Sequence, residues 1–285
     1  MEKLCDLHTH SNFSDGTLSP GELLKAAQTA GLSAVALCDH NTVAGLPDFL
    51  TAAAASPVEA VPGIEISADY QDGEVHILGI FLQPRHYSAV AQKMAQVQQR
   101  KEESNRKLIE ALRAAGVVLD YDEIKAANPD GFINRANIAA ALVAKGYAAD
   151  RKDAFKRFLA PAAGFYCPPK RIDAEESVRF LKSLGAVVIL AHPFLNLDEA
   201  GLRGFLELAV TWGLDGMETE YPLFDEQQRE KARFLAGQFG LLPSGGSDFH
   251  GANKPDICLG TGKGDLRVPL AMLTELRKKA KPQEL

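Results

Sequence analysis

A complete strand, helix and strand unit is encoded by residues 4–40, which read LCDLHTHSNFSDGTLSPGELLKAAQTAGLSAVALCDH. Two short apolar runs predict buried strands, at Leu4 to Leu7 and at Ala34 to Cys38. Between them, Ser19-Pro20-Gly21-Glu22 combines an N-cap serine, a proline at the first helical position and a glutamate three residues after the cap. Gly31 then ends the helix. This pattern indicates parallel strands covered by a connecting helix.

The same alternation continues along the chain. A helix is expected at 44–55, and the apolar stretches 58–66 and 75–82 flank Asp72-Gly73, a dipeptide that favours a tight hairpin. The later part predicts helices at 173–184, 198–212 and 225–239 and strands at 187–191, 216–220 and 241–244. No GxGxxG or GxxxxGK[ST] motif follows any strand, which disfavours an open nucleotide-binding sheet. We therefore expect an α/β protein built on a barrel of roughly seven βα units.

Residues 88–168 interrupt this alternation. They predict a long helix at 90–115 and helical pieces near 121–127, 134–145 and 150–159, with no convincing strand. The chain thus reads as a first barrel segment at 1–87, an all-helical insertion at 88–168 and a second barrel segment at 169–285. Long additions to such barrels are usually functional, so we expect a cap over the active site. The alternative is that the insertion merely covers the barrel.

The composition is that of an ordinary globular protein, with 46% hydrophobic and 24% charged residues. The formal net charge is -6 and the chain has no Lys/Arg-rich run, which argues against an extended surface for nucleic acid or anionic lipid. No apolar stretch approaches the roughly 20 residues of a membrane span, and the N-terminus lacks a signal-peptide pattern. We expect a cytoplasmic protein with no membrane partner. The four cysteines form no CxxC pair and are expected to be reduced.

Histidine and carboxylate side chains gather where the predicted strands end. In a βα barrel these ends share one rim, which carries the reactive residues. His8 and His10 form an HxH pair whose side chains point to the same side of an extended chain, so both can reach one ion. A lone histidine is more often a core or surface residue, but a whole set at one rim favours a metal centre. The candidate ligands are His8, His10, Asp15, His40, Glu65, His76, His192, Asp248 and His250.

Three carboxylates and six imidazoles suffice for three metal ions that share Glu65 as a bridge. Because no thiolate is among the candidates, we expect divalent Mn, Zn, Fe or Mg, with Mn first. Three such ions and three carboxylates leave a cavity charge of about +3, which suits a phosphate ester better than a neutral amide. Clustered metal ions also suit in-line displacement at phosphorus.

The chain resembles the polymerase-and-histidinol-phosphatase (PHP) family, a branch of the amidohydrolase superfamily. The motifs that carry the resemblance occur in family order: HTH at 8–10 followed by Asp15, CDHNT at 38–42, PGIEIS at 62–67, VHILGI at 75–80, AHP at 191–193 and GSDFH at 246–250. The resemblance covers both barrel segments and implies a distorted (β/α)7 barrel with a trinuclear metal site. It implies one ion held by His8, His10, Glu65 and Asp248, a second by Glu65, His76 and His192, and a third by Asp15, His40 and His250.

The insertion resembles the branch of this family that contains nucleoside 3',5'-bisphosphate phosphatases and a 5'-to-3' exoribonuclease acting on short RNA. The leading hypothesis is a phosphatase that removes the 3'-phosphate of a nucleoside 3',5'-bisphosphate. Residues in and after the insertion are candidates for gripping the second phosphate: Asn134, Arg135, Lys170 and Arg171. Asp248 and His250 are the candidates for assisting proton transfer.

Three other functions stay open. The same site could cleave short 5'-phosphorylated RNA one residue at a time, so the expected partners are a small-molecule nucleotide or short RNA oligonucleotides. Hydrolysis of L-histidinol phosphate is permitted by the family, but it gives no role to the basic residues around the insertion. A non-catalytic metal-binding module is disfavoured by the complete set of ligands.

Overall fold

The computed structural model of this chain describes residues 2–71, 73–128, 133, 135–169 and 171–280. The chain divides into two compact units. The first contains Met1–Gln92 and Ile172–Leu285, and the second is Lys93–Arg171. The sequence predicted an insertion at 88–168, and its action as a cap over the active site stays a prediction.

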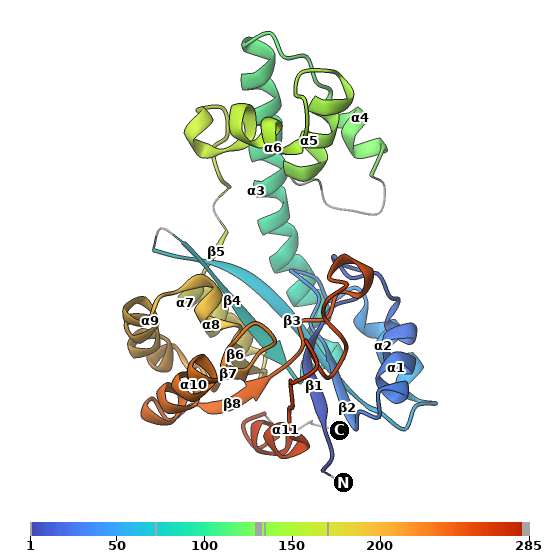
Figure 1. Cartoon of the computed structure of the whole chain (residues 1–285), viewed down its shortest axis with the longest axis vertical. Helices are drawn as coiled ribbons and strands as arrows, with labels where there is room; N and C mark the ends of the chain where they lie inside the picture. Colours follow the sequence, from blue (N-terminus) through green and yellow to red (C-terminus); the bar gives the residue numbers. More distant parts are fainter. Residues whose placement is uncertain (1, 72, 129–132, 134, 170, 281–285) are drawn as a thin grey trace. The chain divides into compact units, whose positions relative to one another are not determined.

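The first unit is built on one sheet, in which seven strands follow the order β1-β2-β3-β4-β6-β7-β8 (Figure 1). A two-residue strand, β5 (Ile172–Asp173), pairs with β3. Strand β4 is antiparallel to both of its neighbours, whereas the other neighbouring pairs along this order are parallel. The seven strands are β1 (Cys5–Thr9), β2 (Ala34–Leu37), β3 (Glu59–Tyr70), β4 (Gly73–Ile80), β6 (Val187–Leu190), β7 (Gly216–Glu220) and β8 (Leu242–Gly245).

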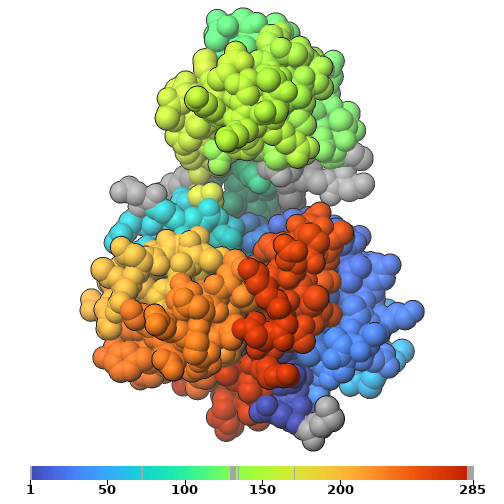
Figure 2. All heavy atoms as spheres, in the orientation of Figure 1, coloured from blue at the N-terminus to red at the C-terminus, as the bar shows by residue number. Residues whose placement is uncertain are grey.

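The sheet curls until its two ends meet. Thr9 at the end of β1 forms a parallel bridge with Phe249, just beyond β8. On the same seam, the backbone N–H of Asp248 donates to the carbonyl of His8 over 2.8 Å. On the face shown in Figure 2, the red C-terminal segment lies beside the blue N-terminal segment. The predicted α/β class and the distorted seven-stranded barrel are confirmed.

Helices surround this sheet (Figure 1). Helix α1 begins as the sequence predicts, because Ser19 and Glu22 exchange the two hydrogen bonds of a capping box. The sequence did not predict the short α8 (Pro193–Asn196) or α11, although Leu273 and Leu276 of α11 are part of the buried core. Besides α8, this unit contains α1 (Pro20–Thr29), α2 (Leu46–Ala53), α7 (Ala174–Ser183), α9 (Glu199–Trp212), α10 (Glu226–Gln238) and α11 (Leu270–Arg277).

The second unit consists of helices joined by turns and loops, and its described residues contain no strand. It contains most of α3 (Tyr87–Ala114), together with α4 (Tyr121–Ala126), α5 (Arg135–Ala144), α6 (Arg151–Ala154) and a π-helical turn at Phe155–Leu159. It has a hydrophobic core of its own, which includes Leu108, Leu112, Ile138, Leu142 and Leu159. Within the described part of the chain, no helix is both long enough and apolar enough to span a bilayer.

Candidate metal centre

Six of the nine ligand candidates lie on the loops that follow β1, β2, β6 and β8, and the other three lie within strands. Each imidazole among them lies within 4 Å of at least one carboxylate of the set, and these contacts connect all nine residues. Strands β1, β3 and β4 themselves carry His8, Glu65 and His76. The structure therefore brings the whole predicted set together.

Glu65 lies at the centre of this network, with a fully buried side chain. Its Oε2 atom is 3.2 Å from Nε2 of both His8 and His10, and 3.0 Å from Nδ1 of His40. All four of these atoms are buried, and none has a hydrogen-bond partner among the described residues. Buried polar atoms without partners are rare and unfavourable, and these point at one another. A divalent cation would satisfy all of them, so the side chains present fit a metal ion.

The other oxygen of Glu65 faces a second pair of imidazoles. Oε1 lies 2.8 Å from Nδ1 of His76 and 3.1 Å from Nε2 of His192. The remaining ring nitrogens have other partners: Nε2 of His76 is 3.0 Å from Glu74, and Nδ1 of His192 is 3.2 Å from Asn196. A carboxylate whose two oxygens face different imidazole groups has the arrangement that a bridging ligand requires.

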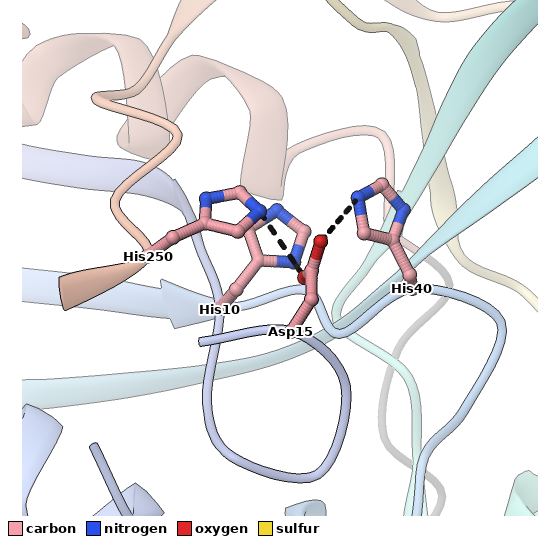
Figure 3. A group of neighbouring side chains, drawn as sticks. All are labelled: His10, Asp15, His40 and His250. Atoms are coloured by element: carbon pink, nitrogen blue, oxygen red, sulfur yellow. Dashed lines mark ion pairs between the residues drawn. The ribbon is translucent and has the colours of Figure 1, made fainter. Parts of the chain in front are cut away.

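Asp15, whose side chain is exposed, lies between His250 and His40 (Figure 3). Its Oδ1 atom is 3.1 Å from Nε2 of His250, and its Oδ2 atom is 3.9 Å from Nε2 of His40. Together with His10, these residues form a group whose potential ligand atoms all lie within 4.8 Å of one another. The geometry therefore adds His10 to the three residues that the family resemblance groups here.

Asp248 uses its two carboxylate oxygens in different directions. Oδ1 lies 3.2 Å from Nε2 of His10 and 3.7 Å from Nε2 of His8. Oδ2 accepts hydrogen bonds from the Tyr221 hydroxyl, at 2.8 Å, and from the Lys254 ammonium, at 2.7 Å. The φ angle of Asp248 is 54°, in the left-handed region that non-glycine residues seldom adopt. Such strain persists where the surroundings fix the residue, and it is common at functional sites.

Burial and the neighbouring charges set the protonation of these groups. Burial favours a neutral Glu65, but the imidazoles around it hold the pKa of its carboxyl well below the usual value. Burial lowers the pKa of His40 to about 4. Burial also lowers the pKa of His10 and His76. There, however, nearby carboxylates outweigh burial and raise the pKa of His10 to about 9 and that of His76 to about 10. Metal ions would replace these imidazolium protons, so metal binding is coupled to proton release.

Two buried aspartates that the sequence analysis did not single out fix the loops that carry the ligands. Asp6 on β1 accepts hydrogen bonds from the backbone N–H (2.8 Å) and hydroxyl (2.6 Å) of Ser247, the residue before Asp248. Asp39 accepts from the backbone N–H of Ser11 (2.8 Å) and from the Ser14 hydroxyl (2.6 Å) in the loop that leads to Asp15. The sequence did contain a signal for both residues. Each aspartate lies in or directly after a predicted buried strand, one or two residues before a candidate histidine ligand.

Glu218 on β7 is a third buried carboxylate that was missed. Its Oε1 atom is 3.0 Å from Nδ1 of His8, and its Oε2 atom accepts the backbone N–H of His192 over 2.6 Å. The first contact places the Nδ1 proton of His8 toward Glu218 and leaves Nε2 to face Glu65. Partners of this kind orient metal-binding histidines and raise their basicity.

We expect Glu218→Ala to weaken metal binding about 10- to 100-fold, because His8 loses the acceptor that fixes its orientation. Calorimetric titration of metal-depleted protein with Mn²⁺ measures this change in affinity. Glu230→Ala, which removes an exposed carboxylate from α10, is the control and should bind Mn²⁺ like the unchanged protein. Equal affinities for the two variants would show that Glu218 does not support the site.

The structure describes only two of the four candidates for phosphate binding, Arg135 and Arg171. Arg135 begins α5, donates to the carbonyl of Leu159 over 3.2 Å and lies with its guanidinium 4.5 Å above the Tyr166 ring. Arg171 is half-buried and already takes part in an interaction. Asn134 and Lys170 lie outside the described residues. A role for these four residues in binding a second phosphate stays a prediction.

Known proteins resemble this chain over most of its length. Residues 6–160 match the family model described as the PHP domain. A 5'-3' exoribonuclease of Haemophilus influenzae is 34% identical over 251 residues, which are 88% of this chain and 91% of that protein. A 3',5'-nucleoside bisphosphate phosphatase of Chromobacterium violaceum is 28% identical, with 86% of each chain covered. The structure of an inferred metal-dependent phosphoesterase of Bifidobacterium adolescentis has a TM-score of 0.77 and 28% identity, covering 99% of this chain and 98% of that one.

Proposed function

This chain belongs to the PHP domain family, and on that premise we propose that it removes the 3'-phosphate from nucleoside 3',5'-bisphosphates. The products would be a nucleoside 5'-monophosphate and inorganic phosphate. The protein is a metal-dependent phosphoesterase whose His, Asp and Glu cluster is able to bind metal ions. The specific substrate is supported by the bisphosphate phosphatase relative from Chromobacterium violaceum.

The observation that carries the proposal is the buried Glu65 carboxylate with its imidazoles on both oxygens. Its two sides support two ions that share Glu65, and the Asp15 group supports a third. In this proposal one ion would be held by His8, His10, Glu65 and Asp248, a second by Glu65, His76 and His192, and a third by Asp15, His40 and His250. When bound, divalent ions, Mn foremost, supply an activated water molecule and positive charge for the phosphoryl oxygens.

The chain's own residues would then manage orientation and protons. Asp248 remains ionised, because His8 and His10 outweigh the effect of burial and hold the pKa of its carboxyl well below the usual value. It is thus suited to be a ligand and a proton acceptor rather than an acid. Nδ1 of His250 lies 2.7 Å from the Asp248 carbonyl, and a proton on this nitrogen leaves Nε2 facing Asp15. His250 is the second candidate for proton transfer.

A second candidate function is stepwise 5'-to-3' cleavage of short 5'-phosphorylated RNA. It is favoured by the 34% identity to the exoribonuclease of Haemophilus influenzae. Both reactions place a phosphate beside a ribose at the metal centre, so the two activities are compatible in one site.

We expect metal-replete protein to release phosphate from adenosine 3',5'-bisphosphate, with kcat/KM at least about 100-fold above that for L-histidinol phosphate. Phosphate release on a panel of both compounds and a 5'-phosphorylated trinucleotide measures this. Asp248→Ala should abolish turnover and lower the bound metal. Good turnover of histidinol phosphate without turnover of the bisphosphate would refute the proposal, and mononucleotides from the trinucleotide would establish the second function.

A further inference from the structure

A cavity of about 270 Å³ lies in the first unit, beside Asp248. It is formed by the loops that follow β7 and β8, two neighbouring parallel strands. Tyr221 comes directly after β7, and Asp248 lies in the loop after β8. The carboxyl ends of barrel strands carry binding and catalytic groups, so this cavity is at the functional rim.

The cavity and the metal centre share the Asp248 side chain. Its Oδ2 atom is held by Tyr221 and Lys254, both of which line the cavity. Its Oδ1 atom faces Nε2 of His10 at 3.2 Å. The Asp248 carboxylate therefore lies between a molecule in this cavity and the groups that would hold the reacting phosphate.

The lining of the cavity suits one part of a phosphorylated sugar. Lys254 is half-buried and engaged by Asp248, whereas Lys263 is exposed and makes no hydrogen bond or ion pair with any residue that the structure describes. Its ammonium is therefore available to an anionic group, as a point charge that binds phosphate well. Asp256 also lines the cavity and can accept hydrogen bonds from sugar hydroxyls. Leu223, which is 46% exposed, adds apolar surface.

The volume limits how much of a ligand can enter. Pockets that bury a whole drug-sized molecule measure about 300–1,000 Å³. A cavity of about 270 Å³ is slightly below that range, so it has room for part of a nucleotide, such as a sugar with its phosphate.

We propose that this cavity binds the ribose and the second, non-hydrolysed phosphate of a nucleotide substrate, with Lys263 as the phosphate contact. The proposal rests on the nucleotide phosphatase function given above. It assigns the second phosphate to the barrel unit itself, whereas the guanidinium of Arg135 in the insertion is held by Leu159 and Tyr166.

Kinetics on matched substrates test this assignment. With adenosine 3',5'-bisphosphate, Lys263→Ala should raise KM about tenfold and leave kcat nearly unchanged, because a ground-state contact to a charged group is lost. Lys263→Arg should restore most of the loss. With adenosine 3'-monophosphate, which has no second phosphate, Lys263→Ala should behave like the unchanged protein. The matched control is Lys25→Ala, which removes an exposed lysine from α1 and should alter neither KM.

Binding of adenosine 5'-monophosphate to metal-replete protein separates this proposal from the proposed function, since no hydrolysis is involved. Lys263→Ala should weaken this binding about tenfold and leave binding of adenosine unchanged. If that result holds but the bisphosphate is not hydrolysed, the assignment of the cavity stands and the proposed function fails. If the bisphosphate is hydrolysed and Lys263→Ala retains normal KM and normal affinity, the cavity assignment is wrong and the proposed function stands.

Discussion

Glu65→Gln should lower kcat/KM by about a thousandfold or more and remove most of the bound metal. The amide has nearly the shape of the carboxylate but lacks its charge, and its NH₂ group would face ring nitrogens that the carboxylate now faces. Metal ions contribute several kcal/mol of transition-state stabilisation, and each 1.36 kcal/mol is a factor of about ten in rate. Loss of the shared anion therefore affects every ion that it helps to hold.

The variant should still fold. Glu65 helps to raise the pKa values of His10 and His76 above the ordinary value, so removing its charge lets these imidazoles lose their protons. Neutral imidazoles are less costly to bury than unpaired imidazolium ions. The variant is thus expected to lose metal and activity without leaving uncompensated buried cations.

Metal content per chain, activity and thermal unfolding should be measured on one sample of Glu65→Gln. Glu199→Gln is the matched control, because Glu199 is an exposed residue of α9 whose ion pairs among the described residues are with Lys231 and Arg203. Exposed pairs of this kind contribute little to stability. Normal activity and metal content in Glu65→Gln would rule out Glu65 as the bridging ligand.

The positions of the ligand residues could be predicted because local rules determine them. For the ligands on loops, the apolar runs mark where the parallel strands end, and those ends lie at one rim. Glu65 and His76 instead lie inside β3 and the antiparallel β4, which this rule does not place. Side-chain alternation in an extended chain turns His8 on β1 and His10, directly after β1, to the same side. The capping box at Ser19 and Glu22 likewise depends only on nearby residues, and it is present in the structure.

The supporting contacts could not be predicted because they join distant parts of the chain. Asp6 and Ser247 are 241 residues apart, and His8 and Glu218 are 210 apart. Their pairing depends on how the barrel closes, which no local pattern encodes. Lys263 lies in an irregular loop and carries no periodic signal. In the same way, the contacts of Arg135 with Leu159 and Tyr166 depend on the packing of the insertion.

Gly246 occupies a place where the barrel seam leaves no room for a side chain. A Cβ atom at this position would lie 2.4 Å from both Cβ and the backbone nitrogen of His8. The backbone nitrogen cannot rotate away, so β1 or the loop before Asp248 would have to shift. We expect Gly246→Ala to destabilise the protein by about 3 kcal/mol, the upper end of the usual range for overpacking. That corresponds to a fall of about 6–12 °C in the unfolding midpoint.

The same shift should weaken metal binding, because it displaces His8, whose Nε2 atom lies 3.2 Å from Oε2 of Glu65. Mn²⁺ should then raise the unfolding midpoint less in Gly246→Ala than in the unchanged protein, since stabilisation by a ligand follows its affinity. Gly237→Ala is the matched control: it lies in α10 with nothing within 4 Å of the added Cβ. Alanine favours a helix over glycine by about 0.5–1 kcal/mol, so this variant should unfold at the same or a higher temperature. A Gly246→Ala protein with the stability and Mn²⁺ response of Gly237→Ala would show that the seam tolerates a side chain and that the position of His8 does not depend on it.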